Sequence, residues 1–275
     1  MSQRRVPIFV VDAFTERLFC GNPAAVCLLE KWLPDEVLQS IAAENNLSET
    51  SFVIVQSDGL CRIRWFTPST EVELCGHATL AAAFVVLRFV RPDLHSVRFV
   101  SSGGNLGVHS GDADRLYLNF PCLPTELYSA EDLKTALNTS KECSVFKSHY
   151  DALVVFEDED AVADLLPDLE MLKQLDVRGV IVTSEGRDVD FVSRFFAPGV
   201  GIDEDPVTGS AHCVLIPYWS MRLKKTKLLA KQLSRRGGTL YCEDLRNGRV
   251  EIGGNAVLYS RGEIYLDDDD HSMSE

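Results

Sequence analysis

A predicted helix start at residues 74–79 brings together two side chains that can exchange protons. Cys75 and His77 stand on either side of Gly76, and an almost wholly apolar run, residues 78–87, follows them. The start of a helix offers free backbone N–H groups and the positive end of the helix dipole, which together favour an anion. This stretch therefore predicts a thiol and an imidazole beside an anion-binding helix end.

A second stretch, residues 204–212, has the same form with different chemistry. The carboxylate of Asp205 precedes Gly209, and the hydroxyl of Ser210 follows it at the start of another apolar segment. Glycine lets a ligand approach the backbone closely, and a serine hydroxyl can donate a hydrogen bond to a carboxylate. We expect this helix start to favour a negatively charged group as well.

Glu49 is a further candidate, and it lies outside both stretches. It stands where a predicted helix gives way to a strand, so its carboxylate can point into a cleft instead of solvent. Each candidate also has a structural interpretation. Glu49 could be a surface acid and His77 a helix-terminal histidine with satisfied hydrogen bonds, while Asp205 and Ser210 could be helix caps. The joint occurrence of these groups around one repeated pattern favours function.

The repeated pattern predicts the elements that position these residues. Residues 64–68 and 194–198 each read arginine, aromatic, phenylalanine, small residue, proline. Acidic residues follow in both copies, and then Gly-polar-Ala at 76–78 and 209–211. This order predicts a strand that ends at a proline, a loop with carboxylates and the start of a buried apolar helix. Two copies predict a duplicated α+β architecture with a shared site between its halves.

The predicted strands and turns divide the chain into an N-terminal lobe at residues 1–122 and a C-terminal lobe at residues 123–262. Each lobe is predicted to hold its strands around one buried helix. Turns are predicted at residues 253–254 and 260–262. Residues 263–275 are predicted to form an acidic tail, whose run Asp267 to Asp270 is typical of a solvated terminus. The strand before this tail can pack back on the first lobe.

Composition narrows the classes of partner. With 27 Lys+Arg against 41 Asp+Glu, the formal charge is −14, which repels nucleic acid and anionic lipid. We therefore expect no nucleic-acid and no membrane partner. The sequence shows neither a signal-peptide core nor a run long enough to span a bilayer, and its eight cysteines form no CxxC pair. A cytoplasmic location with reduced cysteines is the expectation.

Several common site types are missing from the sequence. It contains no GxxxxGK phosphate loop and no GxGxxG fingerprint after a strand, so a nucleotide cofactor lacks support. The six histidines show no HExxH or other metal-ligand spacing, and no serine lies in a GxSxG elbow. We expect neither a metal site nor a hydrolase.

Four sequence blocks, in this order, resemble the signature blocks of the phenazine-biosynthesis PhzF-like family. They are NLSET at 46–50, RWFTP at 64–68, LCGHATLA at 74–81 and EDPVTGSAH at 204–212. Residues 11–14 and 21–26 fit as well, so the resemblance covers nearly the whole chain. The sequence looks most similar to the animal branch, the phenazine biosynthesis-like domain-containing proteins.

The resemblance implies the diaminopimelate epimerase-like fold, in which two pseudo-symmetric lobes each wrap a curved sheet around a central helix. The active site of this fold lies in the cleft between the lobes, and the family commonly forms homodimers. The phenazine enzyme is an isomerase in which a glutamate moves a proton between two carbons of dihydro-hydroxyanthranilate without a cofactor. That glutamate corresponds to Glu49. The substrate class implied is a small carboxylic acid.

The same resemblance implies roles for the other motif residues. His77 and Asp205 would exchange protons with hetero-groups of the substrate. Ser210, with the backbone N–H groups of Gly76 and Gly209, would hold a carboxylate or a developing oxyanion.

One departure from related enzymes affects the choice of mechanism. Racemases and epimerases of this fold use a cysteine at both helix starts, whereas this chain has Cys75 at the first and Thr208 at the second. A threonine cannot act as a thiolate base, so a two-thiol epimerase is disfavoured and Cys75 is expected to pack as a small buried side chain. A racemase or epimerase that uses Glu49 or Cys75 against another acid stays an alternative. So does a protein that binds a metabolite without turning it over.

Overall fold

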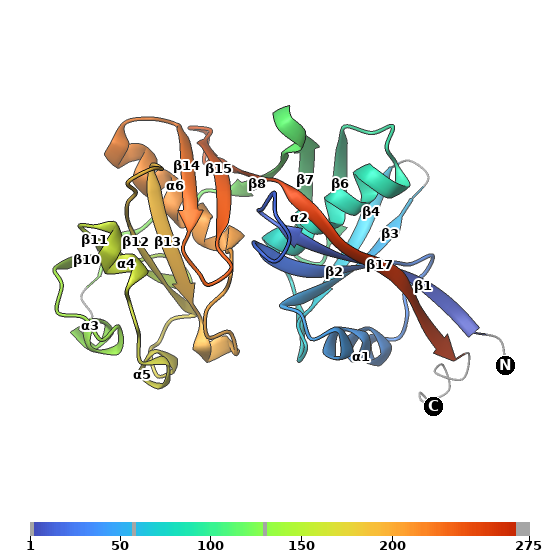
Figure 1. The fold of residues 1–275 in the computed structure, drawn as a ribbon, viewed down its shortest axis with the longest axis horizontal. Coiled ribbons are helices and arrows are strands. Elements are labelled where there is room, and N and C mark those ends of the chain that lie inside the picture. Colours follow the sequence, from blue (N-terminus) through green and yellow to red (C-terminus); the bar gives the residue numbers. More distant parts are fainter. Residues whose placement is uncertain (1–2, 57–58, 129–130, 268–275) are drawn as a thin grey trace. The chain divides into compact units, whose positions relative to one another are not determined.

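The computed structural model describes residues 3–56, 59–128 and 131–267 (Figure 1). Within this part the chain forms two compact units: one contains the residues up to Leu118 and those from Gly254 onward, the other Asn119–Gly253. Residues 254–262 therefore belong to the first unit and not to the second lobe as predicted. The cause is strand β17 (Ala256–Asp267), which pairs with β1 (Gln3–Ala13) from end to end.

Strand β17 also corrects the prediction for the C-terminal residues. It continues through Gly262, where a turn was predicted, because Ser260 to Gly262 stay paired with β1 residues. Residues 263–267 of the predicted tail are strand, and its remaining residues, 268–275, lie outside the described residues. In Figure 1 the red β17 runs alongside the dark blue β1.

The first unit is a sheet in the order β17-β1-β2-β3-β4-β6-β7-β8, with the short β5 beside β4. Its remaining strands are β2 (Asn22–Leu28), β3 (Glu49–Val55), β4 (Leu60–Phe66), β5 (Glu71–Val72), β6 (Ser96–Ser101), β7 (Gly104–Ser110) and β8 (Leu116–Pro121). Its helices are α1 (Asp35–Asn45), α2 (Gly76–Val85), the π-helix Val86–Val90 that continues α2, and a 3-10 turn, Asp112–Asp114.

Helix α1 is amphipathic and helix α2 is buried almost all round. Leu38 of α1 packs into a core cluster with Cys27 and Phe52. The helix ends at Asn46, which takes the left-handed conformation at φ 48°. All residues of α2 except Gly76 and Phe84 are buried, so the prediction of a helix enclosed on every side is confirmed.

Strand alternation decides which side chains face α2. Cys27 and Phe52 point to the α1 side of the sheet. Because successive side chains point to opposite faces, Asn22 of β2 and Glu49 of β3 point to the other face. Ser51 confirms this direction, since its hydroxyl donates to the backbone oxygen of Ala78 in α2 at 3.1 Å. The parallel pairing of β2 and β3 brings their first residues to the same edge, beside the start of α2.

The second unit is a sheet in the order β9-β10-β11-β12-β13-β14-β15-β16. Its strands are β9 (Glu126–Leu127), β10 (Cys143–Lys147), β11 (Asp151–Phe156), β12 (Gly179–Glu185), β13 (Phe191–Phe196), β14 (Lys227–Gln232), β15 (Gly238–Asp244) and β16 (Arg249–Gly254). Its helices are α3 (Glu131–Ala136), α4 (Glu159–Ala163), α5 (Leu169–Lys173), the 3-10 turn Pro198–Val200 and α6 (Gly209–Leu223).

The duplication predicted from the repeated pattern is visible in the strand pairings. From β1 to β8 the successive pairs, with β5 left aside, are antiparallel, parallel, antiparallel, parallel, antiparallel, antiparallel. From β10 to β16 the same succession recurs. Helix α2 lies between β4 and β6 in the chain, and α6 lies between their counterparts β13 and β14. Each helix therefore occupies the same place in its unit.

Helix α6 contains a proline, and the chain compensates for it. Pro217 has no N–H, so the oxygen of Cys213, four residues earlier, cannot receive its usual helical hydrogen bond. The backbone N–H of Leu123 donates to this oxygen at 3.0 Å instead. The oxygen of Cys213 therefore has a hydrogen-bond partner, and this bond also holds α6 to the segment that follows β8.

Candidate functional site

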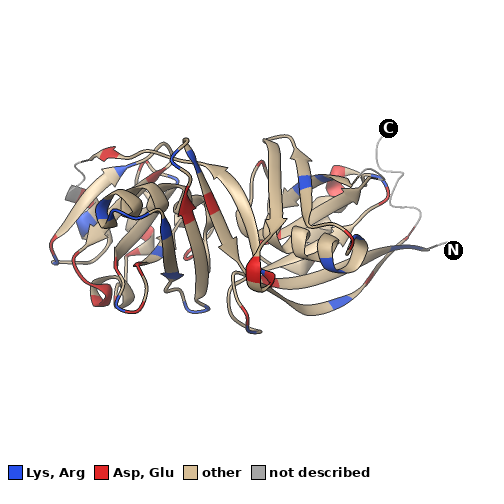
Figure 2. Ribbon diagram, turned by 90° about the horizontal axis from the view of Figure 1, so that it is seen from above, with Lys and Arg blue, Asp and Glu red and all other residues tan. Residues whose placement is uncertain are grey.

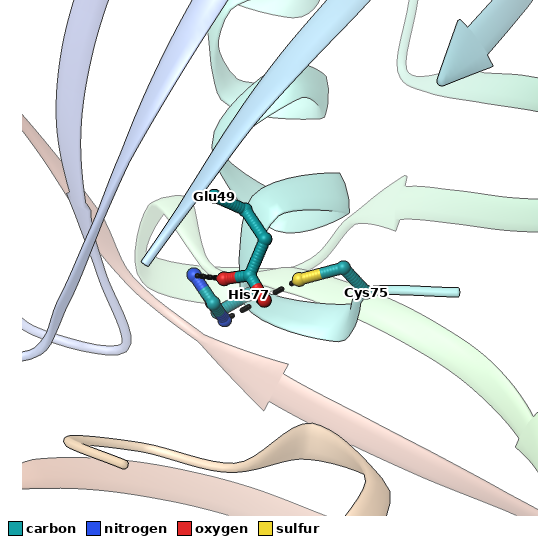
Figure 3. Close-up of side chains that lie close together, drawn as sticks. All are labelled: Glu49, Cys75 and His77. Carbon is teal, nitrogen blue, oxygen red and sulfur yellow. Dashed lines mark hydrogen bonds and ion pairs between the residues drawn. The ribbon is translucent and has the colours of Figure 1, made fainter. Parts of the chain in front are cut away.

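Glu49 and His77 form a close, buried pair in the first unit. Nε2 of His77 lies 3.0 Å from Oε2 of Glu49, and their side chains are 5% and 10% exposed. Glu49 is the first residue of β3, and His77 is the second residue of α2. Figure 3 shows the carboxylate and the imidazole pointing toward one another from these two elements. A carboxylate beside an imidazole supplies an acid and a base within proton-transfer distance.

Cys75 lies on the other side of the imidazole. Its sulfur is 3.5 Å from Nδ1 of His77, and its residue is 7% exposed. It precedes α2 as the cap residue in an extended conformation, and its own side chain makes no capping hydrogen bond. Figure 3 shows the imidazole reached by the thiol and by the carboxylate. The predicted thiol and imidazole are therefore adjacent, with Glu49 as third member.

Asn22 orients the imidazole. Its amide nitrogen lies 3.1 Å from Nδ1 of His77, and the residue is fully buried. In the neutral ring this amide can donate only to an unprotonated Nδ1, which leaves the ring proton on Nε2, facing Glu49. The hydroxyl of Ser48 donates to the Asn22 oxygen at 3.3 Å. Since Ser48 directly precedes Glu49, the hydrogen bonds of Ser48 and Asn22 link the backbone beside Glu49 to the ring of His77.

Burial and charge set the protonation of this group. Burial disfavours a charged imidazole, but the Cys75 sulfur and the Glu49 carboxylate raise the pKa of His77 well above its usual value. Burial, with the Glu49 charge, raises the pKa of the Cys75 thiol to about 11. At neutral pH the thiol is therefore protonated, and the imidazole favours its charged form beside the carboxylate.

The same three residues form a donor set that a metal ion could use. One ligand atom from each of Glu49, Cys75 and His77 lies within 4.8 Å of the others, and all three residues are buried. Thiolate, imidazole and carboxylate are ligands that Zn²⁺ accepts. Sequence spacing did not reveal this set, because Glu49 comes from a different element.

In the second unit, Asp205 is held by a network of buried hydrogen bonds. The hydroxyl of Thr208 donates to its carboxylate at 2.6 Å. The amide of Gln232 donates to the backbone oxygen of Asp205 at 2.7 Å and accepts from the backbone N–H of Thr208 at 2.9 Å. Asp205, Thr208 and Gln232 are 7%, 6% and 1% exposed. Thr208, the counterpart of Cys75, thus serves to orient a carboxylate.

Ser210 is linked to a cation. Nη2 of Arg178 donates to its hydroxyl oxygen at 3.2 Å. Nε and Nη2 of Arg178 also hold Asp151, at 2.9 Å and 2.5 Å, and the side chain of Asp151 is fully buried. The guanidinium lies over the rings of Tyr150 and Phe195, at 5.3 Å and 5.9 Å from their centres. An ion pair and two rings therefore fix this arginine beside the start of α6.

Close to this site, His212 is buried in α6 and neutral. Its Nδ1 lies 2.8 Å from the backbone oxygen of Thr208, so that nitrogen carries the ring proton and donates. Burial lowers the pKa of His212 to about 4, despite this hydrogen bond. The ring packs against Phe191, with centroids 5.8 Å apart.

The structure brings the predicted residues together within each unit. Glu49, His77 and Gly76 meet at the start of α2. In the second unit, Asp205 lies just before α6, whose first residues are Gly209 and Ser210. The predicted cleft between the lobes remains a prediction.

Four positioning residues were not predicted from the sequence. Asn22 was given no role, although residues 21–26 fit the family pattern; it is fully buried and begins β2. Gln232 lies at the end of a strand that was not predicted, and Asp151 and Arg178 lie outside every motif. A polar residue at a strand end was the one available signal, and it is weak because such residues are common in loops.

The chain matches a family model over most of its length. The model is described as phenazine biosynthesis-like protein, and residues 11–262 match it. The chain belongs to the phenazine biosynthesis-like protein family. An uncharacterised isomerase of Pseudomonas aeruginosa is 52% identical over 257 residues, which are 93% of this chain and 97% of that protein. Membership in this family supports an isomerase or epimerase role.

Other members of the phenazine biosynthesis-like family include a mammalian protein and a solved structure. Phenazine biosynthesis-like domain-containing protein 1 of Mus musculus is 41% identical, over 94% of this chain and 99% of its own. The crystal structure of a PhzF-family protein from Enterococcus faecalis has 47% identity and a TM-score of 0.91, and covers 96% of this chain and 100% of its own. The family prediction is confirmed. Identity to the bacterial isomerase exceeds that to the mouse protein, so the animal branch is not singled out.

The fold prediction is confirmed too. A hydroxyproline epimerase from Agrobacterium vitis shares the fold with this chain at a TM-score of 0.62 and 10% identity, covering 97% of this chain and 93% of its own. The protein is thus a sheet-dominated α+β molecule of the epimerase-like type.

Lys and Arg are interspersed with Asp and Glu along the ribbon (Figure 2). No helix within the described residues is long and apolar enough to cross a membrane. The expectations about nucleic acid, location and dimerisation remain predictions.

Proposed function

We propose that this protein is a cofactor-independent isomerase that moves a proton within a small carboxylic acid, with Glu49 as the proton carrier. The supporting observation is the 3.0 Å contact of the buried Glu49 carboxylate with His77 at the start of α2. A carboxylate with its partner already in place can accept a proton from an activated C–H and return it to another carbon. A relative that is 52% identical is named an isomerase, which supports this reaction class.

The proposal gives His77 the task of a partner acid. Its raised pKa keeps the imidazole charged beside Glu49, so it can donate to a substrate oxygen or nitrogen while Glu49 takes the carbon-bound proton. Asn22 can donate to Nδ1 only in the neutral ring, so this contact orients the imidazole once His77 has given up a proton. Glu49 removes one carbon-bound proton and returns it to another carbon, and His77 takes back the proton that it lent to the hetero-group, so the substrate keeps its composition and both residues recover their starting states.

The second unit is proposed to hold the polar groups of the substrate. Asp205, oriented by Thr208 and Gln232, would exchange a hydrogen bond with a hetero-group. Ser210 and the backbone N–H of Gly209, together with that of Gly76 in the first unit, would stabilise negative charge, because neither cap residue, Cys75 or Thr208, caps its helix with its side chain.

Solvent exchange tests this function. The protein is incubated in D₂O with cyclic and acyclic hydroxy- and amino-acids, and the C–H signals are followed by NMR. Substrate-dependent exchange is expected in the wild type and a loss of at least about a hundredfold in Glu49→Gln. Exchange that survives this substitution refutes the assignment of the base. A tight ligand with neither exchange nor product would show a binding protein instead.

One observation favours a second candidate, an epimerase. The Cys75 sulfur lies 3.5 Å from the imidazole, which could accept its proton. Against this, a thiol with a pKa of about 11 is a poor source of thiolate at neutral pH. An epimerase of this kind inverts one carbon and loses activity in Cys75→Ala, whereas the proposed isomerase relocates a double bond or proton and tolerates this change.

A further inference from the structure

The duplicated topology allows the two helix starts to be compared position by position. In the first unit, parallel pairing sets Ala24 of β2 opposite Glu49 of β3. In the second, the corresponding pairing sets Asp151 of β11 opposite Gly179 of β12. The counterpart of Glu49 is therefore Gly179, and Arg178 directly precedes it.

The helix starts correspond in the same way. Gly76-His77 begins α2 and Gly209-Ser210 begins α6. In the first unit the strand start contacts the helix start through Glu49 and His77 at 3.0 Å. In the second it does so through Arg178 and Ser210 at 3.2 Å. Where one unit has an acid–base pair, the other has a cation and a hydroxyl.

Comparison with two other arginines shows what is unusual about Arg178. Arg64 and Arg194, the arginines of the repeated pattern, each hold a carboxylate with Nε and Nη2 and use Nη1 as well. Nη1 of Arg194 donates to three backbone oxygens, and Nη1 of Arg64 donates to Asp35. Both therefore have all three nitrogens engaged and are structural.

Arg178 has a nitrogen that makes no hydrogen bond within the described residues. Its Nε and Nη2 are used by Asp151 and Ser210, but within the described residues Nη1 has no hydrogen-bond acceptor. The side chain is 36% exposed, so Nη1 can meet a ligand while Asp151 stays fully buried. Ser210 accepts from Arg178, which leaves its own O–H free to donate. The arginine fork and the hydroxyl together present donors that suit a carboxylate.

We propose that Arg178, beside Ser210, binds a carboxylate group of the substrate, with Asp151 as the positioning residue that directs the guanidinium. The two copies of the duplicated site would then be specialised, the first for proton transfer and the second for holding charge. This inference rests on the proposed function, because it takes the ligand of Arg178 to be the substrate of the isomerase. The exposed ring of Tyr150, which lies against the guanidinium, suits a flat ligand.

Direct binding tests this assignment. The full chain is titrated with benzoate and, as an uncharged control of the same shape, with benzamide, by calorimetry. The wild type is expected to bind benzoate at least about tenfold more tightly than benzamide, because only the ionised carboxylate makes charge-assisted hydrogen bonds with the guanidinium. The doubly substituted Arg178→Gln, Asp151→Asn protein, which leaves no buried charge unpaired, is expected to lose this preference.

Two single variants complete the design. Arg178→Lys keeps the charge without the fork and is expected to bind benzoate with intermediate affinity. Arg187→Gln removes another carboxylate-paired arginine of the same unit, one that contacts Asp160, and is expected to bind as the wild type does. Benzoate binding that is unchanged in the double variant, or no preference for benzoate over benzamide in the wild type, overturns the assignment.

Glu49→Gln separates this inference from the proposed function. This variant is expected to keep the affinity for benzoate and to lose proton exchange. If exchange persists in Glu49→Gln while the Arg178 variants lose benzoate, the proposed base is wrong and the carboxylate site stands. If exchange fails in Glu49→Gln and benzoate binds every Arg178 variant equally, the carboxylate site is wrong and the base stands.

Discussion

The buried, neutral His212 predicts a specific loss of stability in mild acid. Its pKa is about 4 in the folded protein, against 6.5 for an ordinary histidine. Below pH 6.5 the unfolded chain binds a proton at this position that the folded chain does not bind, so stability falls as the pH drops from about 6.5 to about 4. The difference of about 2.5 pKa units corresponds to a total loss of about 3 kcal/mol, of which about 2 kcal/mol has occurred by pH 5.

Urea unfolding of the wild type and His212→Gln, followed by far-ultraviolet circular dichroism at pH 8 and pH 5, measures this loss. The glutamine does not titrate, so the wild type should lose about 2 kcal/mol more than the variant between these two pH values. His149→Gln, which removes an exposed histidine from the same unit, is the matched control and should follow the wild type. A wild-type loss within 0.5 kcal/mol of that in His212→Gln, roughly the error of such measurements, refutes a buried neutral imidazole.

Three further predictions concern the two helix starts. Arg178→Met should destabilise the protein by about 3–5 kcal/mol in urea unfolding, because the buried Asp151 loses its partner, and adding Asp151→Asn should recover most of it. If the double variant is as unstable as the single one, the ion pair is not the cause. The raised pKa of His77 contributes stability that is fully present below about pH 6.5 and is lost as the pH rises through the folded value. The stability gap between wild type and His77→Gln should therefore narrow at alkaline pH, and a gap that widens would contradict the charged imidazole. Cys75, with its pKa raised from 9.0 to about 11, should react with iodoacetamide at pH 8 about a hundredfold more slowly than an unperturbed thiol. Peptide mapping measures the rate of alkylation at each cysteine. A rate at Cys75 equal to that at the partly exposed Cys20 would rule this prediction out.

Elements that depend on local pattern were predicted well. The apolar runs at residues 78–87 and 211–219 read as helices enclosed on every side, and α2 and α6 are buried in this way. In each case one segment carried enough apolar periodicity or turn chemistry to specify its own conformation.

Features that depend on pairing between distant segments were not predictable. Gly262 carries a turn signal, yet β1 offers β17 a continuous partner and the strand continues through it. Asn22 and Arg178 became visible as site residues only when parallel pairing placed strand starts beside α2 and α6. The motif residues Glu49 and His77 were found because they lie in recognisable blocks, whereas Asp151, Arg178 and Gln232 lie in none.

The end-to-end pairing of β1 with β17 has a consequence for the order in which the protein is made. On the ribosome, β1 emerges early, but its partner is synthesised only after the whole of Asn119–Gly253. The inserted unit is contiguous in sequence and can complete its sheet first, although it is encoded second. The edge of β1 stays open until translation reaches β17, which makes it the place where a nascent chain is most exposed to wrong strand pairing.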